Sequence, residues 1–220
     1  MSAHVSSYSI PDYHAAFCSA LLPGLGQFIR GRPGAGSFYG LVTIVLVLLS
    51  LALGRVSGRA AEVFFFMLLA LPWWALQSYD AALGPAHTGT DLLRTIRTAW
   101  AQGHDIRFLG LLFLISAGND AILIARNPDY LLPFFCTKLD GYAGFVTKAL
   151  SPILHTVVGY GFLQLKKWSL LAYLVYAAYG TTNALVNLIC FGQGRIRNTL
   201  LFALVVFTSY VIGRRRIFRL

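Results

Sequence analysis

Long runs of apolar residues, separated by short polar stretches, dominate this chain. A helix needs roughly 20 apolar residues to cross a hydrocarbon core of about 30 Å, with some tolerance for tilt. The candidate spans are Ser37–Gly54, Ala61–Ser78, Phe108–Ala125, Ser151–Leu165, Trp168–Phe191 and Asn198–Gly213. The pattern therefore predicts an all-α, polytopic membrane bundle of about six transmembrane helices. The short Ser151–Leu165 span is expected to be tilted or incomplete.

One further apolar segment precedes these spans. Ala15–Leu22 is too short to cross a bilayer and runs directly into Pro23-Gly24-Leu25-Gly26. Proline and glycine break the helix there, and lipid does not tolerate the exposed backbone groups. We expect a short N-terminal interfacial or re-entrant helix, followed by a turn into the first full span.

Two connections between spans have features of the membrane interface. Asp91–Trp100 reads DLLRTIRTAW, with its large apolar residues on one helical face and Arg94 and Arg97 nearer the other. That pattern is typical of a basic amphipathic helix lying at the headgroups. The connection Arg126–Leu150 contains the apolar, aromatic segment Tyr130–Phe135, which favours the interface as well.

The composition fits lipid as the main solvent. Of the 220 residues, 57% are hydrophobic and only 12% are charged. A soluble domain carries about 25% charged residues, which it needs to cover its surface. The formal net charge is +10, but the basic residues flank apolar runs instead of gathering on one amphipathic face. This distribution favours helix-flanking charges over a nucleic-acid-binding surface.

The basic residues also predict an orientation. With six spans, eleven of them fall on one side of the membrane: Arg30, Arg32, Arg94, Arg97, Arg107, Lys166, Lys167, Arg214, Arg215, Arg216 and Arg219. Seven fall on the other side: Arg55, Arg59, Arg126, Lys138, Lys148, Arg195 and Arg197. The excess predicts that both termini face the cytoplasm. If the N-terminal segment crosses the bilayer, the N-terminus moves to the opposite side.

The cysteines and the N-terminus add two expectations. Cys18, Cys136 and Cys190 are too few and too scattered for a disulfide framework or a zinc site. Two of them lie in apolar stretches, where cysteine usually packs as a small hydrophobic side chain. The start MSAHVSSYSIPDYH lacks the basic residues and cleavage site of a signal peptide, so no cleaved leader is expected.

A family resemblance rests on two motifs. Ala20–Gly40 reads ALLPGLGQFIRGRPGAGSFYG, and Trp73–Asp80 reads WWALQSYD. Together they resemble the TM2-like small membrane proteins of bacteria, over roughly residues 15–83. The resemblance implies a membrane hairpin and no particular activity. The remainder, residues 107–220, resembles an uncharacterised four-helix membrane domain through Gly161–Trp168 and its terminal basic cluster.

These observations suggest a division of the chain. Residues 1–83 are expected to form the TM2-like hairpin with its N-terminal interfacial segment. Residues 84–107 are expected to form a cytoplasmic amphipathic linker, and residues 108–220 a four-helix membrane domain.

Asp120 is an ionisable residue inside the third predicted span. Such a residue costs about 2.5–3.5 kcal/mol at the membrane centre on insertion scales. One interpretation is a proton or cation site. The other is that Asp120 pairs with Arg126 or with an amide on a neighbouring helix.

The other polar positions inside spans also have two interpretations. Asn183 and Asn187 point to one face of the fifth span, beneath Tyr173, Tyr176 and Tyr179. They either line a polar cleft or make interhelical hydrogen bonds. His155 is the one histidine well inside a predicted span. Haem ligation needs a second histidine at matching depth, so a packing histidine is favoured and no cofactor is expected.

Two surface features point to contacts with partners. Gly36 and Gly40 are spaced as GxxxG, which either forms a helix-contact face or simply continues the preceding turn. Arg214, Arg215, Arg216 and Arg219 follow the last span and are expected to bind anionic lipid or an acidic partner surface.

No catalytic motif is recognisable, and Gly31–Gly36 lacks the Lys-Ser/Thr of a phosphate-binding loop. The sequence therefore favours a non-catalytic accessory or structural subunit. Such a subunit packs against other membrane proteins, or against a second copy, and stabilises a membrane complex. The alternative is a small transporter or channel that uses Asp120, Asn183, Asn187 and His155.

Overall fold

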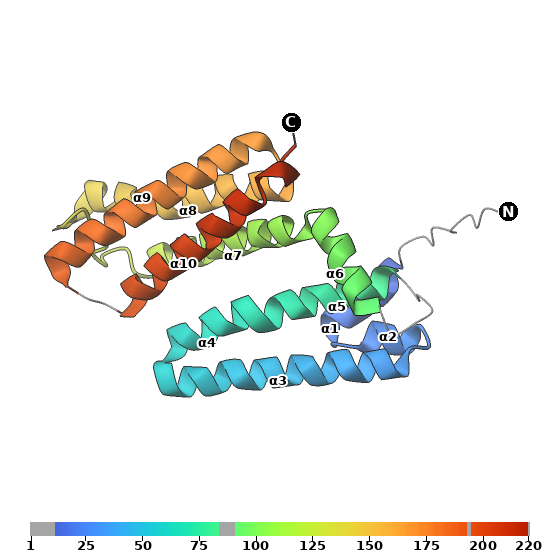
Figure 1. Cartoon of the computed structure of the whole chain (residues 1–220). Helices are drawn as coiled ribbons and strands as arrows, with labels where there is room; N and C mark the ends of the chain where they lie inside the picture. Colours follow the sequence, from blue (N-terminus) through green and yellow to red (C-terminus); the bar gives the residue numbers. More distant parts are fainter. Residues whose placement is uncertain (1–11, 84–90, 193–194, 220) are drawn as a thin grey trace. The chain divides into compact units, whose positions relative to one another are not determined.

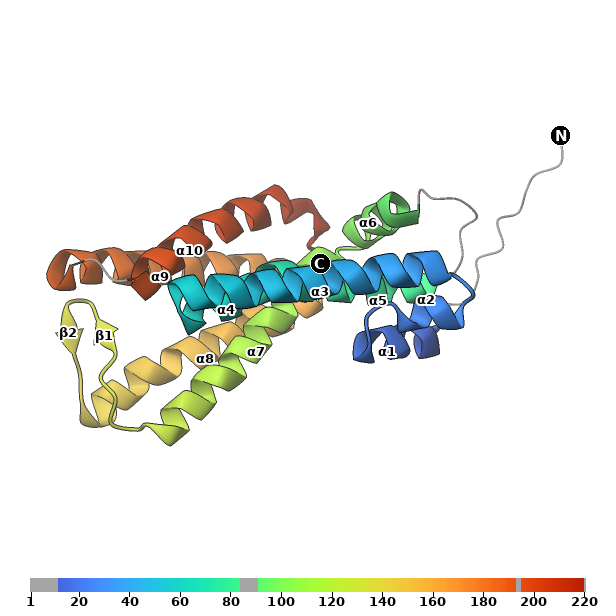
Figure 2. The ribbon, with the colours of Figure 1, turned by 90° about the horizontal axis from the view of Figure 1, so that it is seen from below.

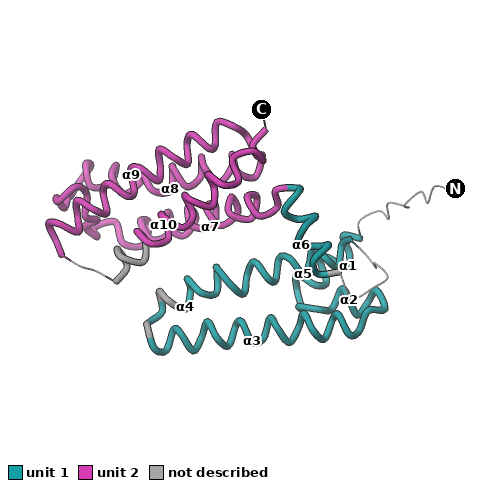
Figure 3. Tube along the Cα trace, in the orientation of Figure 1, with its two compact units in different colours: residues 1–102 teal, residues 103–220 magenta. Residues whose placement is uncertain are grey.

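The chain is almost entirely helical in its computed structural model (Figure 1), which describes residues 12–83, 91–192 and 195–219. It divides into two compact units, residues 1–102 and residues 103–220 (Figure 3). We call them unit 1 and unit 2 and treat each by itself.

Unit 1 is a pair of long helices joined to shorter ones. Its elements are α1 (Tyr13–Leu21), α2 (Leu25–Ile29), α3 (Pro33–Ser57), α4 (Arg59–Phe65), the π-helical turn η1 (Phe66–Ala70), α5 (Leu71–Leu83) and α6 (Asp91–Ala101). The segments α4, η1 and α5 form one continuous helical stretch that packs antiparallel to α3 (Figure 1). Helix α1 packs against α5, and α2 packs against α3.

The break between α1 and α2 is built on close backbone packing. Gly24 has φ +88°, a conformation that side-chain-bearing residues rarely adopt. A Cβ at Gly24 would lie only 2.2 Å from the carbonyl oxygen of Gly36. Gly40 is close to the same turn, because its Cβ would lie 3.2 Å from the Pro23 carbonyl oxygen. The GxxxG face of α3 therefore meets the chain's own Pro23–Gly24 turn.

Unit 2 is a four-helix arrangement with a small hairpin. Its elements are α7 (His104–Arg126), β1 (Pro133–Phe134), β2 (Thr137–Lys138), α8 (Gly141–Leu163), α9 (Lys167–Phe191), α10 (Arg195–Gly213) and the 3-10 turn η2 (Arg215–Ile217). β1 and β2 pair antiparallel at the end of the unit where α8 begins and α9 ends (Figure 2). The core contains Ile106, Val158, Phe162, Tyr173 and Val211.

Helices α7 and α8 approach each other closely through two glycines. A Cβ at Gly110 would lie 2.8 Å from the carbonyl oxygen of Gly159, and a Cβ at Gly159 would lie 2.8 Å from that of Gly110. Small residues at a helix crossing are typical of membrane proteins, where close backbone contact replaces the hydrophobic driving force. The sequence analysis did not identify this pair.

Three helices of the described residues are long and apolar enough to cross a membrane: Pro33–Val56, His104–Arg126 and Lys167–Phe191. Leu201–Gly213 is a shorter apolar helix. The expectation of an all-helical protein is confirmed, and these three helices could span a membrane.

The expected length of the fourth span is wrong. Helix α8 begins at Gly141, well before the predicted start at Ser151, and continues through Pro152. Lys148 made this stretch too polar to be recognised as part of a span. In the structure Lys148 is buried, and its Nζ donates hydrogen bonds to the carbonyl oxygens of Pro128 and Tyr130. A buried charge that is hydrogen-bonded in this way is compatible with a continuous helix.

Candidate functional site

Unit 1 contains a buried carboxylate with three side-chain donors. Asp80 on α5 is only 2% exposed. Its Oδ2 accepts hydrogen bonds from Arg32 Nη1 at 3.0 Å and from Gln27 Nε2 at 3.2 Å. Its Oδ1 accepts from the Thr95 hydroxyl at 2.8 Å. Asp80 therefore ties the α2–α3 turn and the amphipathic helix α6 to α5.

Two glutamines extend this network to α1. Gln27 Oε1 accepts from the Ser19 hydroxyl at 2.8 Å, and Gln77 Nε2 donates to the Ser19 carbonyl oxygen at 2.6 Å. Gln77 Oε1 accepts from the backbone amide of Gly24 at 3.0 Å. These bonds satisfy the backbone groups that the Pro23–Gly24 break leaves without helical partners.

The same residues carry the family resemblance, and in the structure they hold the N-terminal break together. From the sequence, the motifs that contain Gln27 and Asp80 indicate only a family resemblance. A signal was available, because a carboxylate and two amides in apolar segments each need a partner.

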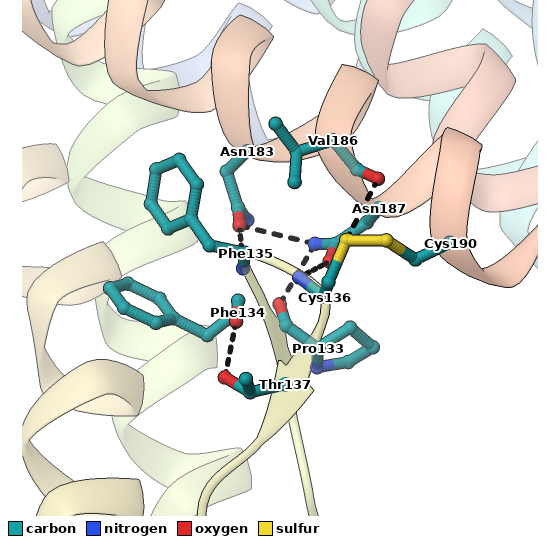
Figure 4. Close-up of a disulfide and its surroundings, with 9 residues drawn as sticks. All are labelled: Pro133, Phe134, Phe135, Cys136, Thr137, Asn183, Val186, Asn187 and Cys190. Carbon is teal, nitrogen blue, oxygen red and sulfur yellow. Dashed lines mark hydrogen bonds between the residues drawn. A yellow bond between two sulfur atoms is a disulfide. The ribbon is translucent and has the colours of Figure 1, made fainter.

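In unit 2, a second polar cluster fixes the β1–β2 hairpin to α9 (Figure 4). Asn187 Oδ1 accepts from the Cys136 amide at 2.9 Å, and its Nδ2 donates to the Pro133 carbonyl oxygen at 3.1 Å. Asn183 Oδ1 accepts from the Phe135 amide at 2.9 Å and from Asn187 Nδ2 at 3.1 Å. Both asparagines are thus engaged with the hairpin backbone.

The hairpin is also covalently attached, because Cys136 and Cys190 form a disulfide (Figure 4). The three scattered cysteines were expected to form no disulfide framework, and for Cys136 and Cys190 that expectation is wrong. The two cysteines lie 54 residues apart in sequence, so their spacing gave no indication of pairing. Cys18 is free.

The hairpin turn explains why several attachments are needed. Its two central residues, Phe135 and Cys136, have φ values of +43° and +65°. Two-residue hairpins require such angles, and Asn-Gly or Asp-Gly usually supplies them. Here a Phe-Cys pair adopts the turn, and the two asparagine bonds and the disulfide hold these residues in place. The Tyr179 ring packs against Phe134 and Phe135.

A third cluster joins α7, α8 and α9 around Asp120. Asp120 Oδ2 accepts from the Ser151 hydroxyl at 2.8 Å and lies 3.3 Å from His155 Nδ1. On the other edge of the imidazole, His155 Nε2 lies 3.1 Å from the Tyr176 hydroxyl. The structure thus brings together two of the predicted residues, Asp120 and His155, with partners that the sequence analysis did not name. Arg126, the predicted partner of Asp120, is exposed at the end of α7.

Aromatic rings surround the imidazole of this cluster. The Phe113 ring centroid lies 5.4 Å from that of His155 and 5.4 Å from that of Tyr176. Tyr173, one turn before Tyr176, contacts the Thr208 hydroxyl on α10 at 3.1 Å. Each of the four long helices of unit 2 therefore contributes polar side chains to an otherwise apolar core.

The basic end of unit 2 is divided between structural and exposed arginines. Arg214 is half-buried and makes two bonds to Asp105, from Nε at 2.7 Å and from Nη2 at 3.0 Å. The Tyr210 hydroxyl donates to the same carboxylate at 2.6 Å. Arg215, Arg216 and Arg219 are exposed. Arg214, one of the four arginines predicted to bind lipid or a partner, therefore forms an ion pair within the fold.

Comparison of this chain with protein-family models, curated proteins and solved structures finds no match. The TM2-like resemblance therefore stays a prediction from the two sequence motifs.

Proposed function

We propose that this protein is a non-catalytic integral membrane subunit. It packs against other membrane proteins, or against a second copy of itself, and stabilises a membrane complex. The observation that carries this proposal is the use of its buried polar groups. Asp80, Gln27 and Gln77 bind the chain's own N-terminal break, and Asn183 and Asn187 bind its own hairpin. Groups committed in this way stabilise a scaffold.

The outward surface of the long helices supports a role in packing. On α3, Leu41, Ile44, Val45 and Leu48 are all more than half exposed. Their spacing of three, four and seven residues places them on one helical face. Helix α10 presents Phe202 and Val205 in the same way. A water-soluble protein rarely exposes such continuous apolar faces, whereas lipid and partner helices accept them.

The proposed membrane arrangement has six spans: α3, the α4–η1–α5 stretch, α7, α8, α9 and α10. Helices α1 and α2 lie at the interface, and α6 lies among the headgroups with Arg94 and Arg97 exposed. The short helix α1, the Pro/Gly turn and the helical hairpin of unit 1 support the TM2-like assignment. We include that assignment in the proposal, without an activity.

The disulfide supports one orientation. Disulfides persist in oxidising compartments, so the hairpin end of unit 2 faces the extracytoplasmic side. Helix α10 runs 19 residues from that end to Arg214, which corresponds to about 28 Å. The basic end therefore faces the cytoplasm, in agreement with the excess of basic residues on that side. Both termini are cytoplasmic in this arrangement of the bacterial inner membrane.

The exposed arginines Arg215, Arg216 and Arg219 then lie at the cytoplasmic leaflet. Each cation near an anionic leaflet contributes on the order of 1 kcal/mol, screened within a Debye length. They bind anionic headgroups or an acidic partner surface in this proposal. Arg214 contributes through its ion pair with Asp105 instead.

The alternative function is a small transporter or channel, and fewer of its four candidate residues are available to line a path. Asn183 and Asn187 belong to the hairpin attachment, which removes them from a transport path. Asp120 and His155 remain, and Asp120 keeps partial exposure, with 26% of its side chain accessible.

Purification in mild detergent followed by native mass spectrometry tests the accessory proposal. We expect a second protein at fixed stoichiometry, or a defined homo-oligomer. Asp120→Asn should form the same complex, because an amide retains the size and hydrogen-bonding capacity of the carboxylate. A monomer with lipid alone, together with an ion flux in vesicles that Asp120→Asn abolishes, would favour the transport function instead.

A further inference from the structure

The pair formed by Asp120 and His155 has a hydrogen-bonding pattern that fits one arrangement of protons. A neutral imidazole has one nitrogen that donates and one that accepts. If Nδ1 carries the hydrogen, it points towards the Asp120 carboxylate, and Nε2 accepts from the Tyr176 hydroxyl. The opposite tautomer would place an imidazole lone pair against a carboxylate oxygen at 3.3 Å, which is unfavourable. Asp120 therefore orients His155.

This arrangement leaves His155 ready to take up a proton. Nδ1 is buried and, among the described residues, its contact with Asp120 falls short of hydrogen-bond geometry. A proton added at Nε2 makes both ring nitrogens donors, with Asp120 and the Tyr176 oxygen as acceptors. The hydrogen of the Tyr176 hydroxyl then turns away from the ring. Both ring nitrogens then lie opposite an acceptor oxygen, Nδ1 at 3.3 Å from Asp120 and Nε2 at 3.1 Å from Tyr176.

Addition of one proton removes the net charge of the pair. Asp120 with a neutral His155 carries one negative charge, whereas the same pair with one added proton carries none in total. A net charge at membrane depth is costly, and pairing removes most of that cost. Because the two groups interact directly, the added proton belongs to the pair and not to either residue alone.

Among the described residues, no charged group other than His155 forms an ion pair with Asp120. Lys148, two turns before His155 on α8, donates to the carbonyl oxygens of Pro128 and Tyr130. Tyr130 lies in the connection between α7 and α8. Burial, and then the charge of Asp120, raise the pKa of its phenol. Tyr176 contacts His155 from α9, Tyr173 packs against Tyr176, and Arg126 is exposed. Asp120 is thus paired with His155 and Ser151.

We propose that Asp120 and His155 form a proton-binding pair in unit 2, with Ser151 and Tyr176 as its hydrogen-bonding partners. The site lies towards the hairpin end of the helices, since Asp120 precedes the end of α7 at Arg126 by less than two turns. Gain or loss of the proton changes the charge inside the bundle by one unit. This inference does not depend on the accessory function.

The test uses full-length protein in detergent whose histidines carry an isotope label. The imidazole resonances are followed by NMR between pH 4 and pH 10. The chain has five histidines, and His155→Gln identifies the signal of interest by its loss. We expect this signal to titrate, and Asp120→Asn to displace its midpoint by at least one pH unit, a tenfold change in proton affinity. If His155→Gln does not fold, the comparison of Asp120→Asn with the wild type still shows whether one of the five midpoints moves.

Matched variants separate this effect from a general disturbance. His104→Gln removes a histidine at the opposite end of α7 and should leave the His155 midpoint unchanged. A His155 signal that does not titrate, or that titrates identically in Asp120→Asn, would overturn the proposal. A midpoint that depends on sodium concentration, and loses this dependence in Ser151→Ala, would also overturn it by identifying a cation site instead.

Discussion

Replacing Asp80 with leucine should lower the free energy of unfolding by about 3–5 kcal/mol, the cost typical of breaking a buried ion pair by removing one partner. Without the carboxylate, Arg32 keeps a largely buried charge with no opposite charge at that contact. Gln27 and Thr95 lose their Asp80 bonds as well. The effect is measured by reversible denaturation of the purified protein in mixed micelles.

A double-mutant cycle identifies the cause of this loss. Adding Arg32→Leu to Asp80→Leu removes the charge that Asp80 no longer balances and should restore part of the stability, as for other ion pairs replaced by apolar residues. Asp140→Leu, at an exposed carboxylate, serves as the matched control and should stay within about 0.5 kcal/mol of the wild type. A loss below about 1 kcal/mol in Asp80→Leu would contradict the network described for unit 1.

Removing the disulfide should have the second largest effect. We expect the double variant Cys136→Ser, Cys190→Ser to lose about 2–4 kcal/mol, because the bond closes a long loop and thereby restricts the unfolded chain. The hairpin turn, with its two residues at positive φ, then loses its covalent attachment and keeps the hydrogen bonds to Asn183 and Asn187. A reductant should destabilise the wild type and leave the double variant unchanged.

Mass analysis after alkylation verifies the pairing itself. The unfolded, unreduced protein should take up one alkyl group, at Cys18, and the reduced protein should take up three. Cys18→Ser is the control for stability, because Cys18 lies outside the disulfide. Uptake of three groups without a reductant would show that the bond between Cys136 and Cys190 does not form.

The helices of this protein could largely be predicted from its sequence, because apolar runs long enough for a membrane rarely form anything else. Helix α3 contains the predicted span Ser37–Gly54, and α9 begins within one residue of the predicted Trp168. The start of α8 was missed because Lys148 interrupts the apolar pattern. Its charge is accommodated by two carbonyl oxygens of a distant connection, which no local pattern reveals.

The clusters were harder to predict because their members are far apart in sequence. Asp80 lies about fifty residues from Arg32 and Gln27, and Cys136 lies 54 residues from Cys190. Asp120 and His155 were each identified as candidates, but their contact with each other was not predicted, because it depends on how α7 packs against α8. That packing rests on Gly110 and Gly159, whose spacing from each other carries no recognisable motif.

The orientation of unit 2 in the membrane underlies the proposed assembly and the placing of the proton-binding pair, and cysteine labelling in intact cells tests it most directly. In a Cys18→Ser background, Asp140→Cys adds a thiol at the hairpin end and Lys167→Cys adds one at the basic end, both at exposed positions. A membrane-impermeant maleimide should label the Asp140→Cys protein in intact cells, and should label the Lys167→Cys protein only after the membrane is permeabilised. Labelling of Lys167→Cys in intact cells, with protection of Asp140→Cys, would contradict the account.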